Sequence, residues 1–203
     1  MMSSKERSRV YFDKEAADYE HSADGRFVAP MYAEVLRQVR AASGRTLLDV
    51  GCGPGSVLQL LADTELALWG IDLSEQMIAE ARRRLGDQVQ LTVGDAQRLP
   101  YAKGCMDIIV CNASFHHYPR PAAVLAEMGR VLTPGGVLIM GETNPPLLLR
   151  LVLNPLLRFS HSGDYHLYSQ RELQRLLEEN GFALTHWVKP NADTCVLTAH
   201  RRA

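Results

Sequence analysis

Short apolar runs alternate along the chain with longer amphipathic stretches, and Gly, Pro, Asp or Ser stands at most of the changes. The early runs are continuous and rich in β-branched residues, as in strands that are buried on both faces. Alternation of such strands with helices is typical of a parallel sheet covered by helices. We therefore predict strands at residues 46–50, 67–71, 89–93, 106–111, 136–141, 182–188 and 194–200.

Several helix boundaries and one strand pairing are also indicated. Ser74 is placed to cap a helix that runs to about Leu85. The sequence "SQRE" at 169–172 is a capping box, and "NG" at 180–181 is a helix stop. Only "KPNAD" separates the last two strands, whereas parallel neighbours need a crossover of about a dozen residues. These two strands should therefore be antiparallel.

The 203 residues are 46% hydrophobic, which is enough for one domain, residues 1–203, with a full core. A net charge of −1 disfavours binding to nucleic acid or to an anionic membrane. The chain has no signal-peptide pattern at its start and no run of the ~20 apolar residues that span a bilayer, so we expect a cytoplasmic protein without a transmembrane segment. Four scattered cysteines predict reduced thiols and no metal site.

The stretch "LLDVGCGPGSVLQLL", residues 47–61, places Asp49 ahead of Gly51, Gly53 and Gly55, between a predicted strand and a helix. Doubly wound folds bind ligands at such a turn. A dinucleotide would put its pyrophosphate here. At ~5 Å and an effective dielectric of about 20, Asp49 would repel that anion by roughly 3 kcal/mol. The turn favours a cationic ligand such as S-adenosylmethionine, unless Asp49 only caps its own turn.

Two further acids close the next two predicted strands. Asp72 in "GIDLS" is placed to accept both hydroxyls of a ribose, a geometry that nicotinamide enzymes share. Asp95 in "VGDAQRLP" is placed to accept from the exocyclic amine of adenine, while Ala96 offers a backbone N–H. Each acid alone is ordinary, but three acids that close three consecutive strands indicate an adenosyl ligand.

These motifs resemble those of the class I S-adenosylmethionine-dependent methyltransferases, in particular the small-molecule branch that contains the ubiquinone and menaquinone biosynthesis methyltransferases. The similar stretches are "LLDVGCGPG", "GIDLS", "GDAQRLP", "DIIVCNASFHHYPRP" and "RVLTPGGVLIM". The resemblance implies an α/β, Rossmann-like three-layer sandwich with a mainly parallel seven-stranded sheet of order 3-2-1-4-5-7-6, strand 7 being antiparallel. It also implies S-adenosyl-L-methionine as cofactor and a small-molecule methyl acceptor. The implied cofactor-binding residues are Asp49, Gly51, Cys52, Gly53, Gly55, Asp72, Leu73, Met77, Asp95, Ala96, Asn112 and Tyr19.

Residues 1–40 resemble the N-terminal helical cap that folds over the cofactor in this branch. Tyr11 and Tyr19 would then contact the methionine end of the cofactor or wall the acceptor pocket; ordinary packing is the alternative. Methyl transfer is an in-line displacement that depends mainly on positioning, and a base matters only if the acceptor must lose a proton. His116 and His117, after the fourth strand, are the catalytic candidates, with a structural role as the alternative.

Residues 144–168 interrupt the step from the fifth strand to the next helix as an insertion or lid. From Leu147 to Phe159 the apolar positions are too dense for a one-sided surface helix, while Arg150 and Pro155 are unsuited to a membrane span. We expect this segment to pack on its own domain, to form a homodimer contact, or to cover an apolar acceptor. For the last arrangement the candidate polar contacts are Tyr165, His166 and Tyr168.

Two other functions stay open. A nonenzymatic S-adenosylmethionine-binding protein would keep the cofactor pocket but have no competent acceptor site. A nicotinamide-dependent oxidoreductase is disfavoured by Asp49 and by Ser56 and Val57, which follow Gly55 in place of the expected glycine spacing.

Overall fold

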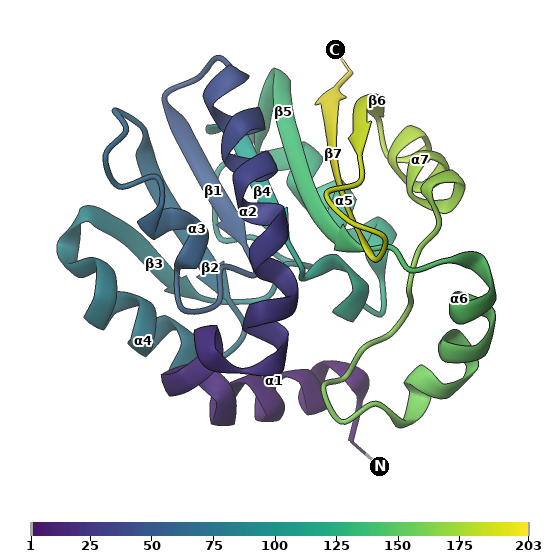
Figure 1. Ribbon diagram of the computed structural model, residues 1–203. Coiled ribbons are helices and arrows are strands. Elements are labelled where there is room, and N and C mark those ends of the chain that lie inside the picture. The colour runs from purple at the N-terminus through teal and green to yellow at the C-terminus, as the bar shows by residue number, and fades with distance from the viewer. Residues whose placement is uncertain (1, 203) are drawn as a thin grey trace.

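The computed structural model describes residues 2–202, which form one seven-stranded sheet between two layers of helices (Figure 1). The strand order is β3-β2-β1-β4-β5-β7-β6. β7 runs antiparallel to both of its neighbours, and the other pairs are parallel. The predicted fold class, strand order and antiparallel closing pair are confirmed. The strands are β1 (Thr46–Val50), β2 (Ala67–Asp72), β3 (Val89–Val93), β4 (Met106–Asn112), β5 (Leu132–Thr143), β6 (Phe182–Val188) and β7 (Thr194–Arg201).

The predicted strand boundaries agree closely with the structure except at β5. This strand begins at Leu132 instead of residue 136, because Leu132 already pairs with Met106 of β4. The register of the pair then shifts between Met106 and Ile108. A register shift of this kind lets the "TPGG" turn sequence enter a strand that a simple pattern would start later.

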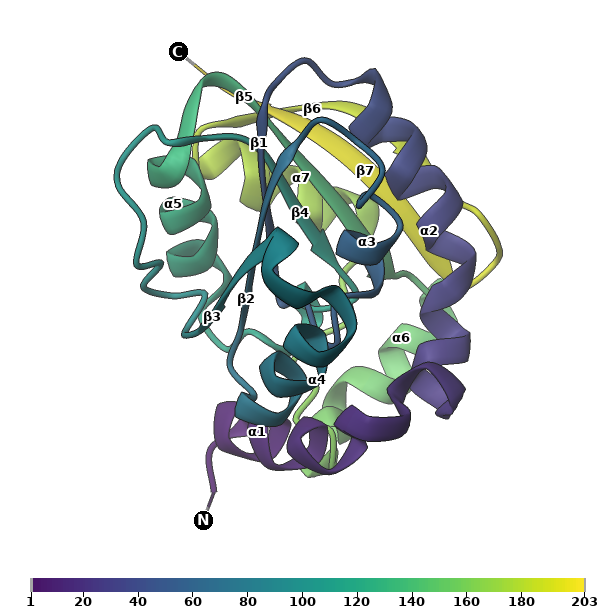
Figure 2. The ribbon, with the colours of Figure 1, turned by 90° about the vertical axis from the view of Figure 1, so that its left-hand side faces the viewer.

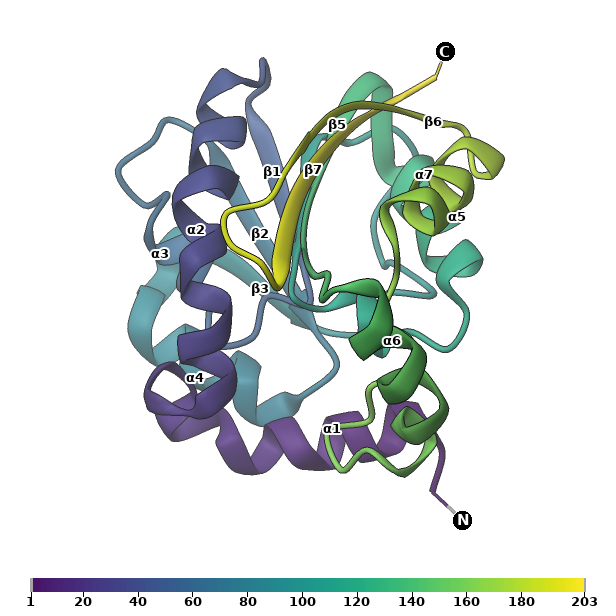
Figure 3. The same ribbon diagram turned by 45° about the vertical axis from the view of Figure 1, so that its right-hand side comes forward.

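Two helical layers cover the sheet, and Figure 3 shows them on opposite sides of it. In β1, Leu47 belongs to the hydrophobic cluster on one face and Leu48 to the cluster on the other, since successive strand residues point to opposite faces. Both layers therefore bury apolar stripes against the strands. The helices on the Leu47 face are α2 (Ala23–Ala41), α3 (Ser56–Gln59) and α4 (Glu75–Leu85). Those on the Leu48 face are α5 (Pro121–Val131) and α7 (Gln170–Glu179).

Both predicted helix caps are present. The Ser74 hydroxyl accepts a 3.0 Å hydrogen bond from the Met77 N–H at the start of α4. Ser169 and Glu172 form a reciprocal capping box at the start of α7. Each cap fixes the start of a helix near the carboxyl edge of the sheet, so the caps help to position the loops at that edge.

The N-terminal segment and the segment after β5 lie together at the carboxyl edge of the sheet (Figure 2). The Arg7 Nε donates to the Ser160 carbonyl over 3.1 Å, which joins the two segments. Among the described residues, no helix combines the length and the apolar content needed to cross a membrane. The remaining elements are α1 (Ser4–Glu15), η1 (Ala16–His21), η2 (Gly86–Gln88), η3 (Phe115–His117), α6 (Leu147–Leu153) and η4 (Asn154–Phe159).

Candidate functional site

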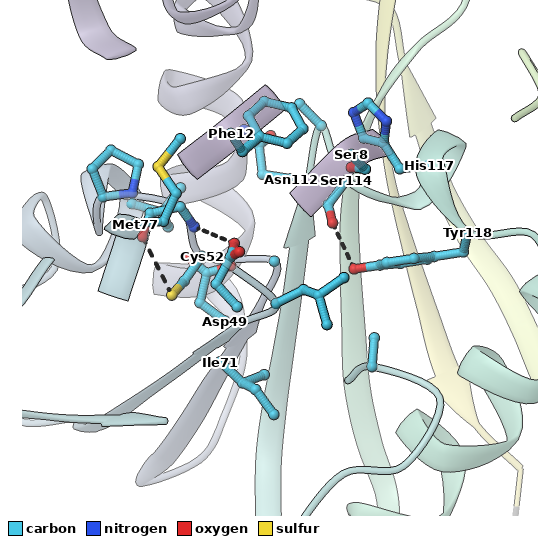
Figure 4. Close-up of a pocket in the computed structure, with 18 of the residues that line it drawn as sticks. Ser8, Phe12, Asp49, Cys52, Ile71, Met77, Asn112, Ser114, His117 and Tyr118 are labelled. Atoms are coloured by element: carbon cyan, nitrogen blue, oxygen red, sulfur yellow. Dashed lines mark hydrogen bonds between the residues drawn. The ribbon is translucent and has the colours of Figure 1, made fainter. Parts of the chain in front are cut away.

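A pocket lies between the carboxyl ends of β1 to β4 and helix α1. Its empty space, including the mouth that is open to solvent, is about 960 Å³. Figure 4 shows Met77 and Cys52 on one side of this space and His117 and Tyr118 on the other. The pocket therefore lies where parallel α/β sheets bind ligands, and α1 forms one wall of it.

The structure brings nearly all of the predicted cofactor-binding residues to this pocket. Gly55 is the exception. Of the two candidate histidines, His117 lines the pocket, whereas His116 lies behind it. The predicted residues that line the wall are Asp49, Gly51, Cys52, Gly53, Asp72, Leu73, Met77, Asp95, Ala96, Asn112 and Tyr19.

The three glycines of the first turn all have positive φ, but each meets a different environment. A Cβ on Gly51 would lie 2.0 Å from the Ser114 hydroxyl, and one on Gly55 would lie 2.6 Å from a Leu85 methyl. A Cβ on Gly53 would meet only Met77, at 3.9 Å, and would project into the pocket. Gly51 and Gly55 are thus required by packing, while Gly53 keeps space free for a ligand.

Asp49, on β1, is a buried carboxyl group whose Oδ1 has no hydrogen-bond partner. Burial, together with the charge of Asp72, raises its pKa from 3.8 to about 8. The Oδ1 of Asn112, a half-buried lining residue, also has no partner. Unpaired buried acceptors are costly, and a cationic ligand with N–H donors would relieve both.

Asp72, at the end of β2, organises the glycine turn from the side. Its Oδ2 accepts from the Gly53 N–H and its Oδ1 from the Ser74 N–H, each over 2.9 Å. Burial raises its pKa, although these backbone donors act in the opposite direction. Each oxygen keeps further lone pairs, so Asp72 can hold the turn and still accept from a ribose.

Asp95, after β3, has a partner that the sequence did not indicate. The ammonium group of Lys5 lies 2.5 Å from its Oδ2, while the Gln97 N–H donates to its Oδ1 over 3.0 Å. The Lys5 and Asp95 side chains are 38% and 30% exposed, so this ion pair stays partly hydrated. An adenine amine would therefore compete with Lys5 for one oxygen of Asp95.

Several lining residues were not predicted. Lys5, Ser8 and Phe12 reach the pocket from α1. Their spacing of three and four residues is that of one helix face, a signal that the sequence does contain. Ala113, with φ of 52°, is the one non-glycine residue with positive φ in the described chain, and it also lines the pocket. Nothing in the alanine itself indicates this conformation. Tyr11 instead donates to Asp24 over 3.0 Å.

The two histidines belong to a polar cluster that draws on distant segments. His116 Nδ1 lies 2.8 Å from the Oε2 of buried Glu142 on β5, and its Nε2 lies 3.5 Å from the Oδ1 of Asp164. His117 Nδ1 is 3.4 Å from the same Oδ1. The backbone also ties the segments together, because the Tyr165 N–H donates to the His116 carbonyl over 2.8 Å. Glu142 and Asp164 were both missed by sequence reasoning.

Burial and charge affect the two histidines in opposite directions. Burial lowers the pKa of His116, but the charge of Glu142 and its hydrogen bond outweigh burial and raise it overall. Burial and the neighbouring His116 lower the pKa of His117. Burial raises the pKa of Asp164, but the charges of both histidines outweigh it and lower it overall. The lowered pKa of His117 therefore favours a neutral imidazole at the pocket wall.

In the single chain, residues 144–168 pack only partly on their own domain: Leu167 is buried, whereas most leucines of α6 stay exposed. Leu148 is 78% exposed and Leu151 is 63% exposed. The segment is anchored by polar bonds instead: the Asn154 side chain accepts from the Leu167 N–H over 2.8 Å and donates to its carbonyl over 3.1 Å. A homodimer contact and a lid both remain predictions. The candidate polar contacts Tyr165, His166 and Tyr168 do not line the pocket.

Comparison with known proteins agrees with the fold. A family model described as a methyltransferase domain matches residues 48–140. An uncharacterized methyltransferase of Geobacillus sp. (strain WCH70) is 28% identical, over 93% of this chain and 95% of that protein. A demethylmenaquinone methyltransferase of Oceanobacillus iheyensis is 31% identical, over 57% of this chain and 52% of that protein. The chain spans about half the length of many of the curated relatives that it matches.

Solved structures extend the similarity across the chain. The structure of the magnesium protoporphyrin IX methyltransferase of Synechocystis, with bound S-adenosylhomocysteine, is similar to this chain with a TM-score of 0.75 and 20% sequence identity. The similarity covers 98% of this chain and 100% of that chain. Identity at this level shows the fold alone. The glycine-turn motif and the match to a methyltransferase-domain model make residues 48–140 similar to the class I S-adenosylmethionine-dependent methyltransferases, and the solved structures show the same fold over the rest of the chain.

Proposed function

We propose that the chain transfers a methyl group from S-adenosylmethionine to a small-molecule acceptor. The observation that carries the proposal is the buried carboxyl group of Asp49, a pocket-lining residue whose Oδ1 has no hydrogen-bond partner; the Oδ1 of Asn112, a second lining residue, is also unpartnered. The ammonium and sulfonium groups of the cofactor are the kind of charge that such oxygens attract. Asp72 and Asp95 add acceptors for ribose hydroxyls and for the adenine amine. NAD has no cation to offer Asp49 at its pyrophosphate, which disfavours the oxidoreductase alternative.

The residues of the chain would act mainly by holding and enclosing the reactants. When bound, the cofactor supplies an electrophilic methyl group. Asp49 and Asn112 orient its cationic end, while Phe12 and Tyr19 from the N-terminal cap exclude water, which favours a step that disperses charge. His117 is proposed to border the acceptor, and His116 supports it from behind. None of these roles requires a covalent bond to the protein.

The N-terminal cap (1–40) and the segment 144–168 are assigned to enclosure of the reactants. Their contact through Arg7 and Ser160 supports a joint role, since movement of one segment would move the other. The exposed leucines of α6 favour either an apolar acceptor or a second copy of the chain as their cover. The cytoplasmic location expected from the sequence is kept in the proposal.

Calorimetric titration with S-adenosylmethionine, S-adenosylhomocysteine and NAD tests the cofactor. We expect both adenosyl compounds to bind and NAD not to bind. A screen of small apolar acceptors with hydroxyl, amine or activated carbon nucleophiles, read by formation of S-adenosylhomocysteine, tests the reaction. Tight binding of NAD alone would contradict the proposal. Cofactor binding with no product from any acceptor would favour the nonenzymatic alternative.

A further inference from the structure

Three side chains from two distant segments converge beside the pocket. One potential ligand atom from each of His116, His117 and Asp164 lies within 4.8 Å of the other two. Asp164 Oδ1 lies 3.5 Å from His116 Nε2 and 3.4 Å from His117 Nδ1. Ligands placed about 2.1 Å from zinc at the corners of a tetrahedron are ~3.4 Å apart. Two of the three edges therefore already have the length that a tetrahedral metal site requires.

A second layer of residues holds these groups in the orientation that a metal needs. His116 Nδ1 faces Glu142 Oε2 at 2.8 Å, which leaves Nε2, 3.5 Å from Asp164 Oδ1, as the nitrogen available to a metal. Asp164 Oδ2 accepts from the hydroxyls of Ser160 and Ser162, over 2.6 and 2.5 Å, which leaves Oδ1 for the histidines. Carboxylates behind a ligating histidine and donors behind a ligating carboxylate are the usual support of protein metal sites.

The remaining histidine supplies an independent observation. His117 is 9% exposed, and its Nδ1 is buried without a hydrogen-bond partner. A proton between His116 and Asp164 would join that pair but would leave His117 Nδ1 unsatisfied. A cation bound by all three groups satisfies every one of them at once.

We propose that His116 Nε2, His117 Nδ1 and Asp164 Oδ1 bind one divalent transition-metal ion. Two imidazoles and one carboxylate suit zinc, and a three-residue set leaves one position open for water or a substrate. Because His117 lines the pocket, the site borders the space assigned to the acceptor. On the proposed methyltransferase function, the open position takes an acceptor oxygen, whose pKa a bound metal lowers. The sequence alone indicated no metal, because the third ligand lies in the segment after β5.

The test titrates metal-free, untagged protein with zinc and with cobalt(II), in the absence of cofactor and acceptor. We expect one ion per chain, with a dissociation constant at or below about 1 μM, and the intense visible absorption of four-coordinate cobalt(II). Asp164→Asn and His117→Gln should each weaken binding at least a hundredfold. His186→Gln is the matched control, since His186 pairs with Glu34 far from the cluster and should not affect the metal.

Binding of less than half an ion per chain, or equal binding by Asp164→Asn and the wild type, overturns the proposal. Thermal unfolding and titration with S-adenosylhomocysteine show whether each variant is folded. Both metal-site variants should keep their cofactor affinity, because the carboxylates assigned to the cofactor lie at the other end of the pocket. If the metal proposal is wrong, the wild type will bind S-adenosylhomocysteine but no metal. If the proposed cofactor is wrong, the wild type will not bind S-adenosylhomocysteine, whether metal is present or not.

Discussion

The two ends of the pocket are built from different kinds of sequence. The cofactor end uses short stretches in which the residues that matter stand next to a strand end, such as Asp49 with Gly53 and Asp72 with Ser74. The histidine end combines η3 with Glu142 of β5 and with Asp164, beyond α6 and η4. A site made from local turns can be recognised as a motif, whereas a site made by long-range packing emerges only when the chain is folded.

The largest effect is expected at Gly53, at the cofactor end of the pocket. Gly53→Val should weaken binding of S-adenosylmethionine at least a hundredfold, or about 2.7 kcal/mol, because the side chain enters space that is otherwise free. Gly181→Val is the control, since Gly181 also has positive φ and a free Cβ position but lies at the end of α7. Both variants should lose similar stability, roughly 1–2 kcal/mol. Calorimetry that shows equal affinities for the two would remove Gly53 from the site.

Asp72 should give the next largest effect. Asp72→Ala removes an acceptor for the ribose and loosens the turn at Gly53, so affinity should fall about tenfold to a hundredfold, or roughly 1.5–3 kcal/mol. Asp107→Ala is a suitable control, because Asp107 also accepts backbone N–H groups, from Arg45 and Thr46, but outside the pocket. That control should lower the melting temperature and leave affinity unchanged. An unchanged dissociation constant for Asp72→Ala would refute the ribose assignment.

Gly53 and Asp72 both belong to the part of the site that was predicted from the sequence. Strand periodicity located the strands, and the family resemblance supplied their order, which periodicity alone cannot give. Gly53 and Gly55 look equivalent in the motif, but only the folded chain shows Gly55 against Leu85 and Gly53 facing open space. Asp164 has no local signal at all, since its role depends on how residues 144–168 return to η3. The exposure of Leu148 likewise depends on the course of residues 144–168 in the folded chain and cannot be read from the hydrophobicity of the residue.

The pH dependence of cofactor affinity tests the charge at Asp49. Since burial raises the pKa of this carboxyl group to about 8, the empty protein carries a proton there at pH 6 to 7. A cationic ligand favours the carboxylate, so binding releases that proton, and affinity should rise with pH by up to about tenfold per unit below the pKa. Titration between pH 6 and 7.5 keeps the amino group of the ligand, with a pKa near 8, mostly protonated.

Calorimetry in two buffers of different ionisation enthalpy counts the released proton directly. Asp49→Asn should bind more weakly and lose the pH dependence, because the amide does not titrate in this range. Wild-type affinity that stays constant from pH 6 to 7.5 would mean that Asp49 does not meet a cation.

A smaller effect is expected at the opposite end of the pocket. His117→Ala should change the affinity for S-adenosylhomocysteine by less than about threefold, because less than 1 kcal/mol of cofactor interaction is assigned to this side chain. Turnover should fall once an acceptor is found. A parallel loss of cofactor affinity and turnover would show that His117 supports the cofactor end, and the division of the pocket into two ends would then fail.

The smallest effect should come from Lys5, a residue of the N-terminal cap that pairs with Asp95 at the cofactor end of the pocket. The Lys5–Asp95 pair is partly exposed on both sides, so it contributes at most about 1 kcal/mol, or a fivefold change in affinity. If the adenine amine needs the same Asp95 oxygen, Lys5→Ala should tighten cofactor binding by up to about fivefold, most clearly at low salt, where the competing pair is strongest. Arg83→Ala is the control, because Arg83 pairs with Glu80 on the exposed side of α4 and should leave affinity unchanged at every salt concentration. Weaker binding by Lys5→Ala would instead mean that the cap closes more firmly over a filled pocket, with Lys5 holding it in place while the ligand is bound.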